Sequence, residues 1–303
     1  MSSQGTLPWW MIMGVKVVLA RLPLPYRFWT KLGFFVHGDM EQPNRVIDIF
    51  KLHARSAGLL DESGAKPVLR PLAIPGSGAP VVLEIGPGDS VFSALVAASL
   101  GASASYLVDA GDFATRDPAA FTAMLDFLRQ QGMPMPMEPA VVSMQSVLQA
   151  AHASYLTEGN ASLKTIPSQS VDYCFSNAVL QSVWRDQFDE LARELARIVK
   201  PGGVCVHRVD LKDLLGCSLN NLRFSAKVWE SRLMRSSGFY TNRLRHTEIV
   251  AIFTQAGFDC ELSRVVRWDS VPIARKALAA PFSTMSDDEL SVSGIDLVLR
   301  RRV

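Results

Sequence analysis

The stretch that decides the fold is Val81-Val82-Leu83-Glu84-Ile85-Gly86-Pro87-Gly88-Asp89-Ser90. Its apolar half, Val81 to Ile85, predicts a buried β-strand, and a helix is expected after the turn. The two glycines permit a sharp turn and leave room for a ligand against the main chain. Glu84 is an acid inside the apolar run. Since a buried carboxylate is costly unless it meets donors or a cation, Glu84 points to a ligand with a positive group.

A second acid follows the next predicted strand. Tyr106-Leu107-Val108 ends in Asp109, which lies 21 residues beyond Gly88, the spacing at which a carboxylate binds the ribose hydroxyls of a nucleotide. NAD, FAD and S-adenosylmethionine (SAM) all use such an acid. The dinucleotide fingerprint has a third glycine where this chain has Val91, so close helix packing over a pyrophosphate is not encoded. Asp109 alone does not decide between the two cofactor classes.

The rest of the central region alternates strand and helix. Ser170 to Asn177 predicts a buried strand with a polar end, and Pro201-Gly202-Gly203 is expected to stop a helix before the next strand begins at Val204. This alternation over residues 81–210 is typical of a parallel sheet. The helix is predicted over Asp186 to Lys200 from apolar residues at helical spacing, namely Phe188, Leu191, Leu195, Ile198 and Val199.

In this order, the pieces resemble class I SAM-dependent methyltransferases over about residues 78–260. The matching pieces are Glu84-Ile85-Gly86-Pro87-Gly88, Asp109, the Asp172-to-Asn177 strand and Lys200-Pro201-Gly202-Gly203. The resemblance implies an α/β fold with a Rossmann-like, doubly wound sheet of seven strands, whose antiparallel last strand lies beside the fifth. The expected domains are a helical N-terminal extension over residues 1–75 and a SAM-dependent methyltransferase domain over 76–303. An acceptor-binding insertion at 211–246 follows strand five.

The resemblance implies SAM as cofactor and S-adenosylhomocysteine as its product, bound beyond the carboxyl ends of the strands. We expect Gly86 and Gly88 at the methionine part, Asp109 at the ribose and Asn177 under the methyl group. Asn160 stands where relatives often have an aspartate, and its amide can still bind adenine. The expected cofactor-binding residues are Glu84, Gly86, Gly88, Asp89, Asp109, Asn160, Ala161 and Asn177.

Two residues are candidates for a general base. Many relatives have a histidine five residues after the Asn177 position, where this chain has Ser182, so no base is expected there. His207 and Asp210 are expected just after the fifth strand, and histidine suits proton removal near neutral pH. Strand alternation places these two side chains on opposite faces. A hydrogen-bonded interior position for His207 is an equally good interpretation.

Residues 211–246 are rich in aromatic, amide and arginine side chains, which suit a sugar or another polyhydroxylated acceptor. A solvated helical hairpin is the other interpretation. Together with His37-Gly38-Asp39-Met40, the segment resembles bacterial methyltransferase-domain proteins associated with surface polysaccharides, which implies a glycan O-methyltransferase. A small-molecule N-methyltransferase, a methyltransferase-like scaffold at a membrane and an NAD-dependent oxidoreductase stay open. The expected acceptor-binding residues are Arg208, Asn221, Arg223, Trp229, Tyr240, Asn242 and Arg243.

The composition limits the partners. The 303 residues are 48% hydrophobic and 20% charged, which suits a globular protein, and the net charge of +2 gives no case for a nucleic acid. The cysteines show no C-x-x-C spacing, so they are expected to be core thiols of a cytoplasmic protein, with no metal site. They are Cys174, Cys205, Cys217 and Cys260.

The N-terminus has an apolar run from Leu7 to Leu22, interrupted by Lys16 and Arg21. It is too charged for a spanning helix and lacks the pattern of a signal peptide. Either it packs on the core or on the partner of a homodimer, or residues 7–35 lie at the inner face of the membrane. In the second case Lys16, Arg21, Arg27 and Lys31 would approach anionic lipid.

Overall fold

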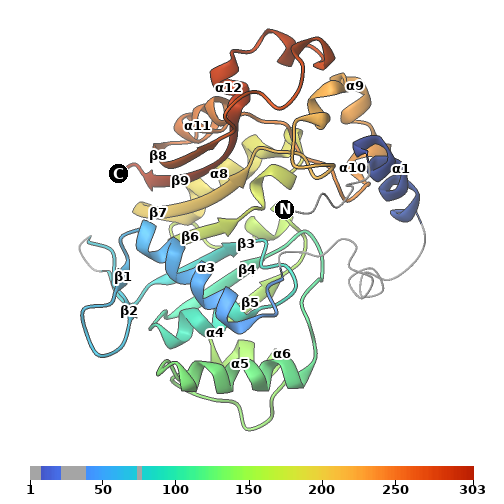
Figure 1. Ribbon diagram of the computed structural model, residues 1–303. Coiled ribbons are helices and arrows are strands. Elements are labelled where there is room, and N and C mark those ends of the chain that lie inside the picture. The colour runs from blue at the N-terminus through green and yellow to red at the C-terminus, as the bar shows by residue number, and fades with distance from the viewer. Residues whose placement is uncertain (1–7, 22–38, 74–76) are drawn as a thin grey trace.

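The computed structural model describes residues 8–21, 39–73 and 77–303 (Figure 1). Its centre is a seven-stranded sheet with the strand order β5-β4-β3-β6-β7-β9-β8. The strands of this sheet are β3 (Val81–Ile85), β4 (Ala104–Val108), β5 (Ala153–Leu156), β6 (Val171–Asn177), β7 (Val199–Asp210), β8 (Phe258–Arg267) and β9 (Val292–Arg301).

The sheet has the predicted Rossmann-like topology. Strands β3 to β7 pair in parallel, whereas β9 is antiparallel to both of its neighbours, β7 and β8. The last strand therefore lies beside the fifth, as the resemblance implied. In a parallel sheet all carboxyl ends meet at one edge, so the glycine turn after β3 and the acid after β4 become neighbours.

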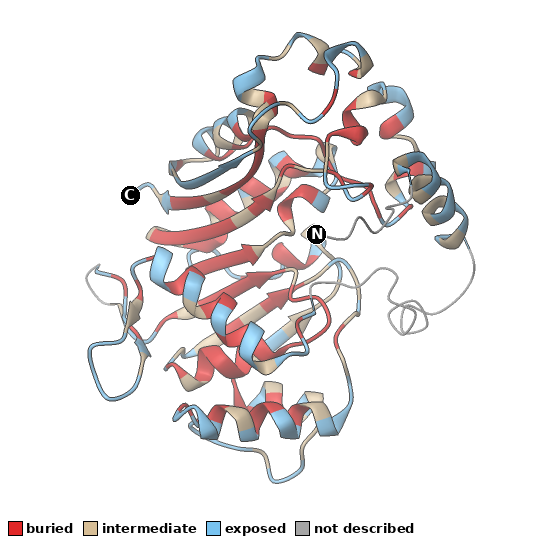
Figure 2. Ribbon diagram, in the orientation of Figure 1, coloured by how far each residue is buried: buried red, intermediate tan, exposed pale blue. Residues whose placement is uncertain are grey.

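Helices cover both faces of the sheet, and the central strands are accordingly buried (Figure 2). One core cluster joins α3, α4, α5 and α6 to one face, and a second joins α7, α8 and α11 to the other. The helices are α1 (Trp9–Leu19), α3 (Pro43–Ser56), α4 (Phe92–Ser99), α5 (Pro118–Gln130), α6 (Met144–Ala150), α7 (Asn160–Leu163), α8 (Phe188–Ile198), α9 (Ala226–Trp229), α10 (Arg232–Arg235), α11 (His246–Gln255) and α12 (Asp287–Ser291).

A short antiparallel pair, β1 (Leu60–Asp61) and β2 (Val68–Leu69), follows α3 in the N-terminal extension. One sequence expectation about a boundary was wrong. The helix α8 ends at Ile198, and Pro201-Gly202-Gly203 lies inside β7, where the pairing with β6 shifts register. A Cβ atom at Gly203 would lie 2.8 Å from the Lys200 carbonyl oxygen, so this irregular strand start requires glycine.

The insertion at 211–246 forms a small lobe of short helical turns, and α1 packs on it. The Lys16 ammonium donates to the Leu214 carbonyl oxygen at 3.2 Å, and the Trp9 ring meets the edge of Phe224 at 6.1 Å. The outer side of α1 leaves Trp10 and Val18 more than half exposed. None of the helices in the described ranges has the length and apolarity needed to cross a bilayer. Arg27, Lys31, His37 and Gly38, all named from sequence, lie outside those ranges.

Candidate active site

The glycine turn after β3 is fixed by hydrogen bonds to the next strand. Gly86 and Gly88 both have φ of 72°, a conformation that favours glycine. The Gly86 amide donates to the Val108 carbonyl oxygen at 2.8 Å, and the Gly88 amide donates to the Asp109 carboxylate at 3.0 Å. A Cβ at Gly86 would lie 2.4 Å from the Val179 side chain, so Gly86 is also required by packing.

Asp109 connects this turn to the segment after β5. Its carboxylate also accepts from the Ala110 amide at 2.7 Å, and its carbonyl oxygen accepts from the Gly159 amide at 2.8 Å. Burial raises the pKa of Asp109 to about 6, against the lowering effect of the two amides. The carboxylate thus lies at the carboxyl edge, where it was expected to meet a ribose.

Glu84 is the buried acid of the strand, with 2% of its surface exposed. It accepts a hydrogen bond from the Ser93 hydroxyl, and burial raises its pKa to about 8. A cation nearby would stabilise its ionised form. The ammonium group of SAM is such a cation, and Asp109 is an acceptor for ribose hydroxyls, so this donor and acceptor set fits SAM.

The segment before α3 contacts the glycine turn. The Asp89 carboxylate accepts from the Asp39 amide at 3.2 Å, and the Ser90 hydroxyl donates to the Met40 carbonyl oxygen. The Asp89 carbonyl oxygen accepts from the Thr115 amide at 2.7 Å. Asp89 therefore joins the segment before α3 to the glycine turn.

Asn160 and Ala161 begin α7, on the segment that follows β5. The Asn160 side-chain amide donates to the Gln187 carbonyl oxygen at 3.0 Å, and the Ala161 amide donates to the Glu158 carbonyl oxygen at 3.2 Å. The nitrogen of Asn160 is thus bonded to the start of α8. Its expected contact with adenine stays a prediction.

Asn177 ends β6 on the face covered by α3, where a histidine meets it. The Nε2 atom of His53 lies 3.3 Å from the Asn177 side-chain oxygen, and the His53 ring lies 5.5 Å from the ring of Phe175. Burial lowers the pKa of His53 to about 4, so the imidazole is neutral at pH 7. His53 was not among the residues named from sequence, although a histidine on the apolar face of a helix was a detectable signal.

A cavity of about 240 Å³ opens at the ends of β7, β8 and β9. Arg208, which pairs with Asn177 across the strands, donates to both Asp296 carboxylate oxygens at 2.8 and 3.0 Å. Lys212 lies 3.8 Å from Asp210, and Arg264 lies 3.9 Å from Asp296. The lining residues are Arg208, Val209, Asp210, Lys212, Arg264, Val266, Ser293, Gly294, Ile295 and Asp296.

The cavity brings together both predicted and missed residues. Arg208 and Asp210 were named from sequence, whereas Lys212, Arg264 and Asp296 were not. Arg264 and Asp296 come from strands that follow the insertion, and their approach to β7 depends on the sheet order. No local pattern in the sequence indicates that contact.

The expectation that His207 and Asp210 lie just after the fifth strand was wrong. β7 continues to Asp210, and the His207 side chain is completely buried. Its Nδ1 atom lies 2.8 Å from the Ser176 hydroxyl, and its ring stacks on Phe253 at 5.8 Å. Burial lowers its pKa to about 3. The interior interpretation of His207 is therefore correct, and the side chain does not line the cavity.

The polar side chains of the insertion mainly hold the insertion itself. The Trp229 indole donates to the Thr241 carbonyl oxygen at 2.7 Å, and the Tyr240 hydroxyl donates to Glu230 at 2.7 Å. Arg243 donates to the Phe224 carbonyl oxygen at 2.7 Å. Because the short helical turns leave carbonyl groups unpaired, side-chain donors satisfy them. These residues do not line the cavity, and their expected contact with an acceptor stays a prediction.

The remaining expected acceptor residues have similar roles. Asn242 donates to the Leu180 carbonyl oxygen at 2.8 Å and so connects the insertion to the turn that follows Asn177. Asn221 donates to the Thr241 hydroxyl at 2.9 Å, and Arg223 donates to the Asn220 side chain at 3.0 Å. Arg223 also lies over the Trp9 ring of α1, 5.1 Å from its centre.

Comparison with known proteins agrees with this geometry. Residues 83–207 match the family described as "Methyltransferase domain". No curated protein matches the sequence.

Solved structures with the same general fold are only distantly similar. The YcgJ protein of Bacillus subtilis is 14% identical with a TM-score of 0.44, over 86% of this chain and 99% of that one. SAM-dependent methyltransferases of Methanosarcina mazei and Mesorhizobium loti are each 15% identical, with TM-scores of 0.41 and 0.40. The matches cover 74% and 75% of this chain and 93% and 94% of the other chains. At these TM-scores the structures give no information about the acceptor.

The matched segment contains the glycine turn, both acids and the strand that ends in Asn177. On that match, residues 83–207 of this chain are similar to a methyltransferase domain.

Proposed function

We propose that this protein transfers the methyl group of SAM to a hydroxyl group of a small polar acceptor, most simply a sugar or a glycan. The observation that carries this proposal is the charged cavity at the ends of β7, β8 and β9. One of its lining residues, Arg208, is the strand partner of Asn177, and the cavity lies on the same sheet edge as the glycine turn and Asp109. Cofactor and acceptor would then meet at the end of β6.

The cofactor half of the site consists of acids and backbone amides. Glu84 would meet the ammonium group, Asp109 the ribose hydroxyls, and the turn with Gly86 and Gly88 the methionine part. When bound, SAM supplies a methyl group activated by its positive sulfur. The chain's own contribution is to hold the two reactants in line, and such positioning can supply about 7–11 kcal/mol of the barrier.

The charges of the cavity support a hydroxyl acceptor. Arg208, Lys212 and Arg264 outnumber Asp210 and Asp296, so a protonated amine would meet net positive charge. Sugar hydroxyls both donate and accept, and they can hydrogen-bond to carboxylates and guanidinium groups together. This excess of positive side chains also disfavours the small-molecule N-methyltransferase that the sequence left open.

Asp210 is our candidate general base. It is the last residue of β7, lines the cavity and is about one-third exposed. A carboxylate at this point can accept the hydroxyl proton as the oxygen attacks, an effect worth about 10²–10⁴-fold in rate. His207 and Asp210 are on opposite faces of β7, and only Asp210 reaches the cavity.

The first test is calorimetric titration of purified protein with S-adenosylhomocysteine, after removal of any copurified cofactor. We expect binding in the micromolar range or tighter. Labelled SAM is then offered with a panel of nucleotide sugars and oligosaccharides, and the product is located by mass spectrometry. Binding without transfer to any hydroxyl, together with transfer to amines, would overturn the O-methyl proposal. Absence of binding would overturn the cofactor assignment.

A further inference from the structure

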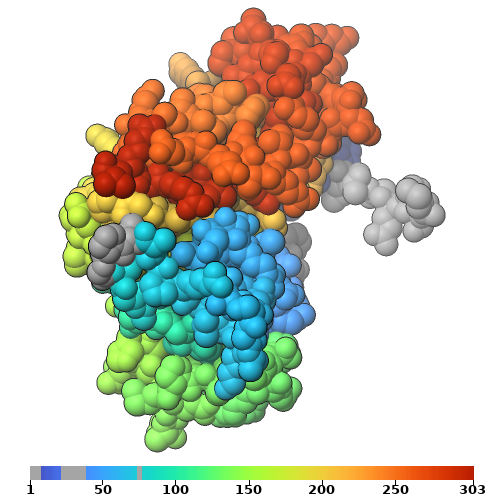
Figure 3. All heavy atoms as spheres, turned by 90° about the vertical axis from the view of Figure 1, so that its left-hand side faces the viewer, coloured from blue at the N-terminus to red at the C-terminus, as the bar shows by residue number. Residues whose placement is uncertain are grey.

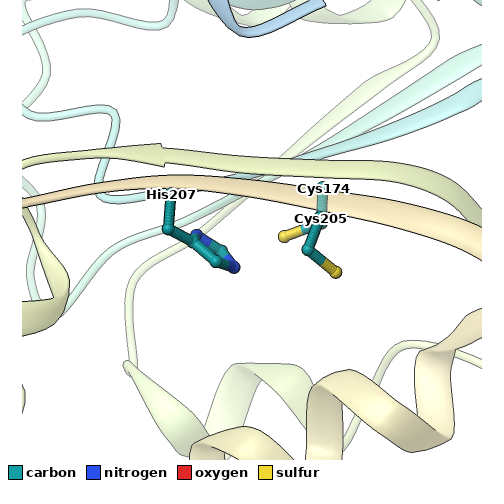
Figure 4. A group of neighbouring side chains, drawn as sticks. All are labelled: Cys174, Cys205 and His207. Carbon is teal, nitrogen blue, oxygen red and sulfur yellow. The ribbon is translucent and has the colours of Figure 1, made fainter. Parts of the chain in front are cut away.

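Cys174, Cys205 and His207 form a buried group that the transfer reaction does not use; we name it the thiol–imidazole cluster. Cys174 and Cys205 are paired residues of β6 and β7, and His207 is two residues further along β7. One ligand atom from each lies within 4.8 Å of those of the other two. Figure 4 shows the imidazole and both sulfur atoms on the same side of the two strands.

One atom of this cluster has no hydrogen-bond partner. The Nδ1 atom of His207 is bonded to the Ser176 hydroxyl, but Nε2 is fully buried and unpaired in the described structure. In Figure 4 a ring nitrogen is directed toward the sulfur atoms. Buried polar atoms in proteins nearly always have a partner, so an unpaired one beside two thiols calls for an explanation such as an ion.

We propose that the thiol–imidazole cluster binds a thiophilic d10 metal ion, Zn²⁺ or Cu⁺, through both cysteine sulfurs and His207 Nε2. Thiolate and imidazole are the preferred ligands of both ions, and metal–ligand bonds of about 2.0–2.3 Å would bring the three atoms slightly closer together. Ser176 completes the arrangement, because a hydroxyl that accepts from Nδ1–H leaves the Nε2 lone pair free for the metal.

The binding step involves no oxidation. Two S–H bonds break, two sulfur–metal bonds form, and two protons pass to solvent. With Zn²⁺ the two thiolates and a neutral imidazole give an uncharged centre, which suits a buried position. With Cu⁺ the three ligands satisfy the coordination number but leave one negative charge. Charge therefore favours Zn²⁺ and ligand number favours Cu⁺.

The position of the cluster indicates a structural role. The Phe253 ring of α11 stacks on His207, and all three ligand residues have no exposed surface. The ion would connect β6 to β7 on the face opposite Asn177 and the cavity. Since no ligand is exposed, the ion would enter as the chain folds rather than afterwards. This inference does not depend on the proposed transfer reaction.

The test is the metal content of the full chain. Protein is purified from cells grown with added zinc or copper, and is separately unfolded and refolded with one equivalent of Zn²⁺, Co²⁺ or Cu⁺ under reducing conditions. Metal is measured by mass spectrometry after desalting. We expect about one equivalent per chain, and a sulfur-to-metal charge-transfer band in the Co²⁺ or Cu⁺ sample. Comparison of the zinc and copper samples, from both the cells and the refolding, shows which ion the cluster prefers.

Matched variants assign the ligands. Cys205→Ala and His207→Gln should lower the bound metal at least tenfold, whereas Cys260→Ala, a thiol outside the cluster, should bind as the parent does. If Cys205→Ala does not fold, the charge-transfer band of the parent protein reports the thiolate ligands directly. Folded parent protein without metal from either route would overturn the proposal. So would equal metal binding by Cys205→Ala.

Discussion

The two faces of β6 and β7 differ although they are built from alternating residues of the same two strands. On the face of α3, Asn177, Arg208 and Asp210 lie at or beside a polar cavity. On the face of α11, Cys205 and His207 are sealed in the core. Neighbouring residues of one strand therefore have unrelated surroundings, and a candidate base cannot be chosen by residue type alone. The predictions below test this contrast between the faces.

The largest expected effect concerns the α3 face of β6 and β7, where the polar cavity lies. Asp210→Asn should lower kcat for the identified acceptor by about 10²–10⁴-fold, because the amide cannot accept the hydroxyl proton. Affinity for S-adenosylhomocysteine should stay unchanged. Steady-state kinetics and calorimetry measure the two quantities. Asp269→Asn, an exposed aspartate outside the cavity lining, is the matched control. A full rate in the Asp210 variant would remove the base assignment.

The next effect concerns the cofactor half. Asp109→Ala should weaken binding of S-adenosylhomocysteine by about 10–100-fold, since hydrogen bonds to a charged group contribute about 1.5–3 kcal/mol. Asp126→Ala, an exposed aspartate on α5 paired with Arg129, should bind normally. Titration calorimetry reads the affinity, and circular dichroism checks the fold. An unfolded Asp109 variant would assign this carboxylate a structural role, through its bond to Gly88.

The third effect is a dependence of stability on pH without cofactor. Burial raises the pKa of Glu84 from 4.5 to about 8, so the folded state holds this proton more tightly than the unfolded state. The contribution of Glu84 to the free energy of unfolding is fully present below pH 4.5. It is lost as the pH rises toward 8, by up to about 1.4 kcal/mol per pH unit. Tm measured from pH 5 to 8 should fall accordingly.

Two comparisons sharpen that measurement. Glu84→Gln should flatten the fall in Tm, because the amide does not ionise. Saturating S-adenosylhomocysteine should also flatten it, since its ammonium group stabilises the ionised carboxylate. A Tm curve that is identical in the parent protein and Glu84→Gln would refute the raised pKa.

A smaller effect is expected from the rim of the cavity. Arg264→Ala should raise KM for the acceptor by about 2–5-fold and leave KM for SAM unchanged, because an exposed charge contributes at most about 1 kcal/mol. Arg302→Ala, which removes an exposed ion pair with Asp259 away from the cavity, serves as control. Equal KM values in both variants would place the acceptor elsewhere.

The smallest expected effect is that of a chelator. EDTA should leave the rate of methyl transfer unchanged, because among the described residues the only cluster with metal-ligand geometry is buried on the opposite face of the sheet. The rate is followed with and without EDTA. A loss of activity that magnesium restores would contradict this expectation and would point to a metal at the carboxyl edge.

The positions of the proposed cofactor residues were predictable because their signals are local. The glycine turn and Asp109 follow apolar strands directly, Glu84 lies inside the first of these strands, and parallel strands bring their carboxyl ends together. The acceptor half was less predictable. Trp229, Tyr240 and Asn242 are residue types that bind sugars, but the same donors also satisfy unpaired carbonyl groups of a loop-rich lobe.

The sequence by itself determined the alternation of strands and helices and the acids at the strand ends, because hydrophobic periodicity and turn residues act over short distances. The seven strands and the antiparallel last strand were implied by the family resemblance. Only the tertiary structure decided which side chains meet across the sheet. Asp296 reaches Arg208, and His53 reaches Asn177, from elements far away in the chain. It also decided that His207 is sealed beside Cys174 and Cys205, because burial depends on which helix covers a face, and no spacing in the sequence records that.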